Sequence, residues 1–136
     1  MHVVFRDSRG LDEAEAPFDP AQDPADLVVL SFSDSDLGAF ATGWRRAGGT
    51  LPALRVQNIV ALRHPLSVDT YVERTLAGAK AILIRLIGGA AYWPYGIASI
   101  QDLARRRGIA LAVLIGGLGV MLGRRARLAA ASHDLL

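Results

Sequence analysis

Apolar and polar residues follow each other in blocks along this chain, and the blocks predict strands and helices in turn. Four runs are short, mainly apolar and rich in valine, isoleucine and leucine, which is typical of buried strands. They cover residues 27–32 (LVVLSF), 54–60 (LRVQNIV), 81–87 (AILIRLI) and 109–115 (IALAVLI). We therefore expect four buried strands.

The segment after the first run carries a helical stripe. Leu37, Phe40, Ala41 and Trp44 recur at i, i+3, i+4 and i+7, which places them on one face of a helix. The pair Gly48-Gly49 ends the pattern. The segment thus predicts a helix with one apolar face.

Two further helices are expected, from Pro65 to about Ala77 and from Pro94 to Gly108. Proline is well tolerated at the first position of a helix, so each proline marks a start. The predicted inward faces are Val68, Tyr71, Val72 and Leu76 in the first of these helices and Ile97, Ile100, Leu103 and Ala104 in the second.

This alternation predicts the fold class. Helices that connect parallel strands make right-handed crossovers, so we expect a small three-layer α/β domain. Its sheet would be mainly parallel, with four to five strands, in a flavodoxin-like or Rossmann-like arrangement. Residues 1–26 would supply an N-terminal edge strand at 3–5 and an acidic extended connection. Residues 27–122 would form the domain, and residues 123–136 a basic tail or the start of a helix.

Composition excludes several classes. At 136 residues the chain is long enough for one domain, and without cysteine it has neither disulfides nor thiolate metal sites. The longest apolar run, residues 109–122, contains three glycines and is shorter than the roughly 18 to 20 residues of a spanning helix. The N-terminus lacks the pattern of a secretory signal. We expect no membrane span and a cytoplasmic location.

Charge is distributed unevenly along the chain. Residues 1–36 hold nine acidic side chains and two arginines, whereas the remainder holds four acidic and thirteen basic ones. The two parts are therefore able to neutralise each other. The arginines at 105–107 end a predicted helix, where positive charge complements the helix dipole. For this reason no nucleic-acid binding is predicted.

Candidate chemistry gathers at one edge of the predicted sheet. Loops after the carboxyl ends of parallel strands meet there, and open α/β sheets bind ligands at that edge. With a single histidine inside the folded pattern, no metal site is predicted and the catalytic residues stay unknown. The candidate ligand-binding residues are Ser33, Asp34, Arg63, His64, Arg85, Gly88, Gly89, Tyr92, Trp93 and Tyr95.

Each candidate also has a structural interpretation. Ser33 lies three residues before Asp36, the spacing of a helix cap, and His64 fits a turn before a proline. Arg85 lies in a buried strand and needs a partner, for which Asp34 is a guess. The glycine pairs lack the lysine and the spacing of phosphate-binding loops. The three aromatic residues either pack on the sheet edge or form a flat wall for a conjugated ligand.

Three stretches carry a family resemblance. They are PADLVVLSFSDSDLGAFATGW, LRHPLSVDTYVERTLAGAKAILIRLIGG and YWPYGIASIQDLARRRGIALAVL. Together, from Pro24 to Leu114, they resemble the amino-terminal part of the CobN family, the large subunits of aerobic cobaltochelatase, which are related to the large subunit of magnesium chelatase. After Leu114 the sequence departs from the family pattern.

The resemblance implies a function for the parent protein. CobN subunits insert cobalt into hydrogenobyrinic acid a,c-diamide during cobalamin synthesis, with ATP and magnesium on partner ATPase subunits. The expected partners are the remainder of the large subunit, the ATPase subunits and the corrin-type tetrapyrrole.

The chain is an expressed domain, a truncated product or a stand-alone protein. In each case we expect it to be inactive alone and to bind no cofactor. It would act as a scaffold or as part of the tetrapyrrole-binding wall. A stand-alone flavin-binding or nucleotide-binding module is the alternative.

Overall fold

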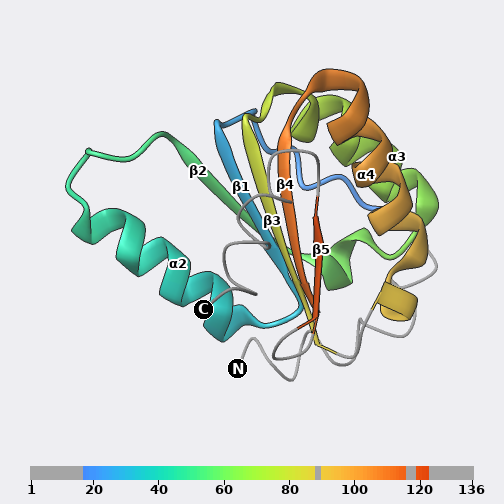
Figure 1. The fold of residues 1–136 in the computed structure, drawn as a ribbon, viewed down its shortest axis with the longest axis horizontal. Coiled ribbons are helices and arrows are strands. Elements are labelled where there is room, and N and C mark those ends of the chain that lie inside the picture. Colours follow the sequence, from blue (N-terminus) through green and yellow to red (C-terminus); the bar gives the residue numbers. More distant parts are fainter. Residues whose placement is uncertain (1–16, 88–89, 116–118, 123–136) are drawn as a thin grey trace.

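A five-stranded sheet lies at the centre of the molecule (Figure 1). The computed structural model describes residues 17–87, 90–115 and 119–122. The strands are β1 (Leu27–Ser31), β2 (Leu54–Asn58), β3 (Ala81–Leu86), β4 (Ala110–Ile115) and β5 (Gly119–Leu122), in the order β2-β1-β3-β4-β5. The first four are mutually parallel, which confirms the predicted α/β class.

Three helices connect the parallel strands. They are α2 (Asp34–Arg46), α3 (Pro65–Arg74) and α4 (Pro94–Arg107). Figure 1 shows α2 on one face of the sheet and α3 and α4 on the other, so the domain has three layers. Both predicted proline starts are confirmed, because Pro65 and Pro94 stand in the first turns of α3 and α4. Gly108 ends α4 with φ 68°, a left-handed conformation that suits glycine.

The second predicted strand ends two residues early. Asn58 closes β2, and its side-chain oxygen accepts a hydrogen bond from the Val60 amide at 2.9 Å. Ile59–Leu62 then forms a 3-10 helix, which buries Ile59 and Leu62. The side-chain oxygen of Asn58 thus caps the turn that replaces the last two strand positions.

Two shorter 3-10 helices adjust the other boundaries. One, Leu76–Gly78, takes the place of the last predicted turn of α3, and the other, Ala90–Tyr92, precedes α4. The fifth strand was not predicted, because the last predicted strand ended at residue 115 and the fifth was expected at residues 3–5. The observed β5 runs antiparallel to β4, with Ala112 opposite Leu122. The predicted edge strand at residues 3–5 and the tail at 123–136 lie outside the described residues.

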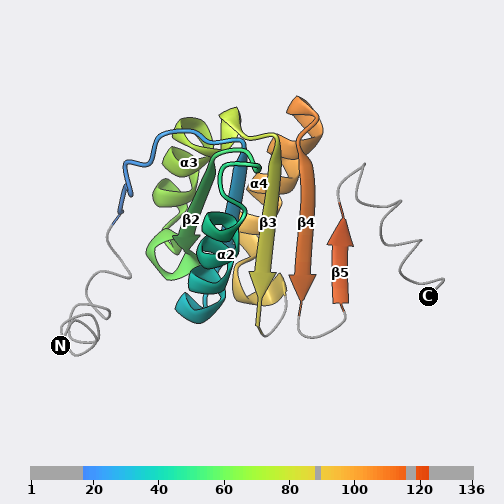
Figure 2. The same cartoon turned by 90° about the vertical axis from the view of Figure 1, so that its left-hand side faces the viewer.

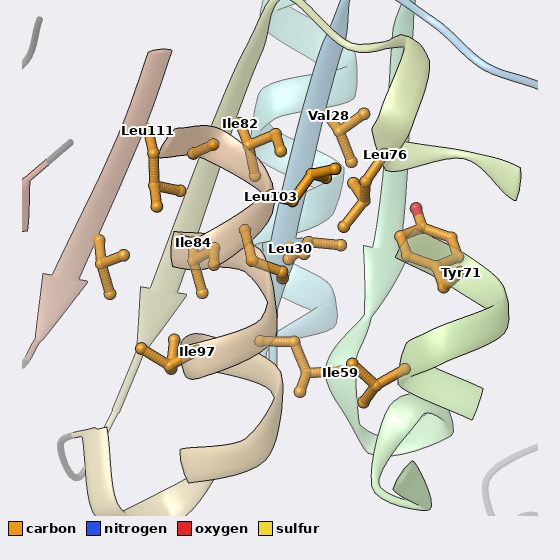
Figure 3. Close-up of a cluster of buried hydrophobic side chains, with 14 of the residues drawn as sticks. Val28, Leu30, Ile59, Tyr71, Leu76, Ile82, Ile84, Ile97, Leu103 and Leu111 are labelled. Carbon is orange, nitrogen blue, oxygen red and sulfur yellow. The ribbon is translucent and has the colours of Figure 1, made fainter. Parts of the chain in front are cut away.

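The core fills the space between the sheet and the layer of α3 and α4 (Figure 3). Alternate residues of β1, β3 and β4 point to this side, as the pleat requires. The buried ones are Val28 and Leu30, Ile82, Ile84 and Leu86, and Leu111 and Val113. The predicted inward stripes of α3 and α4 are confirmed. On the α3 side the buried residues are Val68, Tyr71 and Leu76, and Val72 packs against the same cluster. On α4 they are Ile97, Ile100, Leu103 and Ala104.

Residues 17–26 form a strap across α3 and β2. Thr75 is buried and its hydroxyl donates a hydrogen bond to the Gln22 carbonyl at 2.7 Å. The Gln22 side chain bridges the two elements, since its oxygen accepts from the Tyr71 hydroxyl at 2.7 Å and its nitrogen donates to the Val56 carbonyl at 2.9 Å. The predicted extended connection is therefore tied to the domain by polar contacts.

The strap also accounts for part of the charge asymmetry. Asp19 pairs with Arg74 at 3.3 Å, and Asp26 pairs with Lys80 at 3.7 Å. Within α4, Asp102 pairs with Arg105 and Arg106. Acidic residues of the N-terminal part thus meet basic residues of the later part, as the sequence suggested.

The layer on the α2 side is incomplete among the described elements. Figure 2 shows α2 in front of β1 and β2, with no helix in front of β3 and β4. In the predicted stripe of α2 only Leu37 is buried, and Phe40 is 39% exposed. The prediction of a helix was correct. The apolar face that the spacing predicted is present, and the described part of the chain leaves much of it exposed.

Candidate functional site

The carboxyl edge of the sheet brings together the loops after β1, β2 and β3. In the order β2-β1-β3-β4, the connections from β1 and from β3 leave toward opposite faces, so the topological switch point lies between β1 and β3. Ser31 of β1 is the register partner of Arg85 of β3 at this point. The predicted site residues on these loops therefore lie along one edge, although their side chains serve different purposes.

An ion pair joins β3 to the first turn of α2. The Nε of Arg85 lies 2.7 Å from Oδ2 of Asp36, so Asp36 is the observed partner, two residues beyond the guessed Asp34. The pair is a close charge contact without hydrogen-bond alignment, because the buried Nε has no hydrogen-bond acceptor. The fully buried Ser31 hydroxyl also reaches Asp36 Oδ2, at 3.3 Å. This cluster anchors α2 to the sheet.

Ser33 caps α2, which is the structural interpretation of its spacing. Its hydroxyl oxygen accepts a hydrogen bond from the Asp36 amide at 3.2 Å. Asp34 accepts one from the Asn58 side chain at 2.9 Å, and the same Asn58 nitrogen lies 3.1 Å from the Phe32 carbonyl. Sequence reasoning missed Asn58, although an asparagine at the end of a strand is a signal for such a link.

His64 also serves as a cap. Its Nδ1 accepts a hydrogen bond from the Leu66 amide at 3.1 Å, at the start of α3. Arg63 beside it is exposed. The only histidine among the candidates therefore uses one ring nitrogen to hold a helix start.

The three aromatic residues divide between two environments. Trp93 is only 4% exposed, and its indole N–H donates to the Leu62 carbonyl at 3.0 Å. It therefore packs in the core, so for Trp93 the structure favours packing over a place in a flat ligand wall. Tyr92 is 60% exposed and contacts the edge of Phe32, with ring centroids 4.6 Å apart. Phe32 and Tyr92 are the aromatic pair at the switch point.

Tyr95 points to the neighbouring helix. Its hydroxyl donates to Oδ1 of Asp69 at 2.6 Å, which joins α4 to α3. This hydrogen bond to a carboxylate raises the pKa of Tyr95. Gly88 and Gly89 lie outside the described residues. Over residues 17–87, 90–115 and 119–122 no group of histidine and acidic side chains is able to hold a metal ion.

The fold and the edge define the class of protein: a small doubly wound α/β module whose carboxyl-edge polar side chains largely support its own loops. None of the helices in the described ranges has the length and apolar character to cross a membrane.

Comparison with known proteins gives the family. The chain is 37% identical over 116 residues to the aerobic cobaltochelatase subunit CobN of a Sinorhizobium species, and 36% identical over 113 residues to CobN of Pseudomonas aeruginosa. These two matches confirm the resemblance of the chain to the CobN family.

The similarity covers most of this chain and a small part of each relative. The two matches span 85% and 83% of the chain but 9% of either relative. No family model matches the chain, and no solved structure matches it significantly.

Proposed function

We propose that this chain is a structural module of an aerobic cobaltochelatase large subunit. In that protein the catalytic body and the ring-binding site would lie outside the matched segment. The parent complex would insert cobalt into hydrogenobyrinic acid a,c-diamide in the cytoplasm, with ATP and magnesium on partner ATPase subunits. The chain would support that reaction by packing against the remainder of the large subunit.

This proposal rests on the contacts of the edge residues, most of which are made within the domain itself. Ser33 and His64 cap helices, Arg85 is paired with Asp36, and Trp93 is buried. A macrocycle site would instead need a flat wall, cations for the peripheral carboxylates and a base for the pyrrole protons. Of those parts the described edge offers the exposed Tyr92, which packs on the half-buried Phe32, and the exposed Arg63.

That aromatic pair supports a second candidate function, direct contact with the tetrapyrrole. The exposed face of Tyr92, held by Phe32, is suited to stacking on a conjugated ring. In this alternative the chain would supply part of the ring-binding wall. The experiment that separates the two is a titration of the 136-residue chain with hydrogenobyrinic acid a,c-diamide, followed by visible absorbance.

A structural module leaves the spectrum of the corrin unchanged up to high micromolar protein. A saturable shift that Tyr92→Leu abolishes would contradict it and favour ring contact. Tyr95→Leu is the matched control, because Tyr95 is exposed as well but lies against α3. A yellow cofactor retained on purification would instead favour a flavin-binding module.

A further inference from the structure

A groove crosses the face of the sheet that carries α2. Its volume is about 590 Å³. Its floor comes from the amino-terminal halves of β1, β3 and β4, and its wall from α2 and the loop before β2. Every lining residue is apolar or glycine, and those that carry the argument are Val29, Leu83 and Ala112 on the sheet, Phe40 and Trp44 on α2, and Leu51 on the loop.

The groove lies on the face of the sheet that the described helices cover only in part. Parallel sheets are buried on both faces in folded proteins, yet α2 lies over β1 and β2 only (Figure 2). Leu83 and Ala112 on the uncovered strands are half-buried, and Phe40 and Leu51 are 39% and 46% exposed. A continuous apolar surface of this kind marks a contact site.

The relatives indicate what covers it. The matched segment is 9% of their length, so roughly nine-tenths of a large subunit lies outside it. The carboxyl edge offers that remainder mostly polar side chains that are engaged within the domain. The groove offers it apolar surface that none of the described residues covers, and burial of such surface drives association.

We infer that the groove beside α2 is the docking site for the remainder of the cobaltochelatase large subunit. An apolar segment of that remainder lies across Leu83 and Ala112, against Phe40 and Trp44, and completes the third layer of the domain. The inference rests on the proposed function. It adds the surface through which the module is held.

Hydroxyl-radical footprinting tests it on two proteins. One is the 136-residue chain, and the other is the P. aeruginosa subunit in which this chain replaces the matched segment. In the fusion protein, oxidation of Phe40, Trp44 and Leu51 should slow by about threefold or more, because a docked partner excludes water from the side chains it covers. Leu66 and Tyr95, exposed on the opposite layer, are the internal controls and should react equally in both proteins.

A charge in the groove should reverse the protection. Ala112→Glu in the fusion protein is expected to return Phe40 and Leu51 to the rates of the isolated chain. The same substitution at Ala98, exposed on α4, should leave them protected. Urea unfolding of both variants in the 136-residue chain establishes that they fold.

Four results would overturn the inference. The first is that the groove residues are oxidised at equal rates in the two proteins, and the second is that the α3 and α4 layer is protected instead. The third is protection of the groove that depends on the concentration of the isolated chain. The fourth is that the groove residues of the isolated chain are oxidised faster when residues 123–136 are removed. The third result would assign the groove to a second copy and the fourth to the chain's own segment. Loss of cobalt insertion in a fusion protein with a protected groove would contradict the proposed function alone.

Discussion

The contact between Gly96 and Trp93 gives the sharpest test of the local packing. Gly96 lies in the first turn of α4, and a Cβ atom added to it would overlap Cε2 of the Trp93 indole. Real Cβ atoms do not approach other atoms so closely. Gly96→Ala therefore requires either the indole or the start of α4 to move.

The cost follows from what the indole would lose. Overpacking a core position costs about 1 to 3 kcal/mol. Displacement of Trp93 also strains its hydrogen bond to the Leu62 carbonyl, worth about 1 kcal/mol. The higher helix propensity of alanine offsets at most about 1 kcal/mol of this loss. We expect a net loss of about 2 kcal/mol in the free energy of unfolding.

Urea unfolding followed by circular dichroism measures this loss. Gly38→Ala is the matched control, because Gly38 lies inside α2 and a Cβ there meets nothing within 4 Å. That control should gain about 0.5 to 1 kcal/mol from helix propensity alone. If Gly96→Ala proves as stable as the unchanged chain, the close packing of the YWPYG stretch is refuted.

Three further predictions concern the strap, the caps and the buried tyrosine. Thr75→Val removes the hydrogen bond to Gln22 and should cost about 1 to 2 kcal/mol in urea unfolding, whereas the exposed Thr42→Val should change little. His64→Ala should cost about 1 kcal/mol through the lost cap, and His64→Asn should restore it; equal stability of the two variants would contradict the capping role. Burial raises the pKa of Tyr71 above its ordinary value of about 10, so stability present below that pH should be lost as the pH rises further. Tyr71→Phe should remove up to about 1.4 kcal/mol per pH unit of that decline, measured by unfolding between pH 9 and 11.5; an unchanged slope would refute the linkage.

Much of this fold was predictable from local patterns. The four parallel strands, the proline starts of α3 and α4 and the glycine stop at Gly108 follow from periodicity and from backbone chemistry. These signals are local. They do not depend on which strands are neighbours in the sheet, and for this reason they can be recognised in a single sequence. The edge strand β2 is only half-buried, although its sequence predicted a buried strand.

The side-chain roles at the edge were less predictable because they depend on pairing across the sheet. Asp36 rather than Asp34 faces Arg85, since the α2 turn orients residues two apart in different directions. The WPYG sequence gave no direct sign that the glycine leaves room for the tryptophan ring. Asn58 was overlooked because its partners are 24 and 26 residues away.

The α2 stripe illustrates a different limit. Its spacing predicted an apolar face, and the face exists, but periodicity does not state whether the covering surface belongs to the same domain. Phe40 and Leu51 are exposed beside a sheet face that needs a cover. The chain matches 9% of its relatives, so the apolar surface that the described residues leave open is a candidate contact for the rest of such a protein.

The most direct test of the central claim is a cobalt insertion assay with the P. aeruginosa subunit and its ATPase partners. Three forms are compared: the intact subunit, the subunit without the matched segment, and the fusion protein in which this chain replaces that segment. If the chain is a structural module of the family, deletion abolishes insertion and replacement restores it. A folded fusion protein with no more activity than the deletion would contradict the claim.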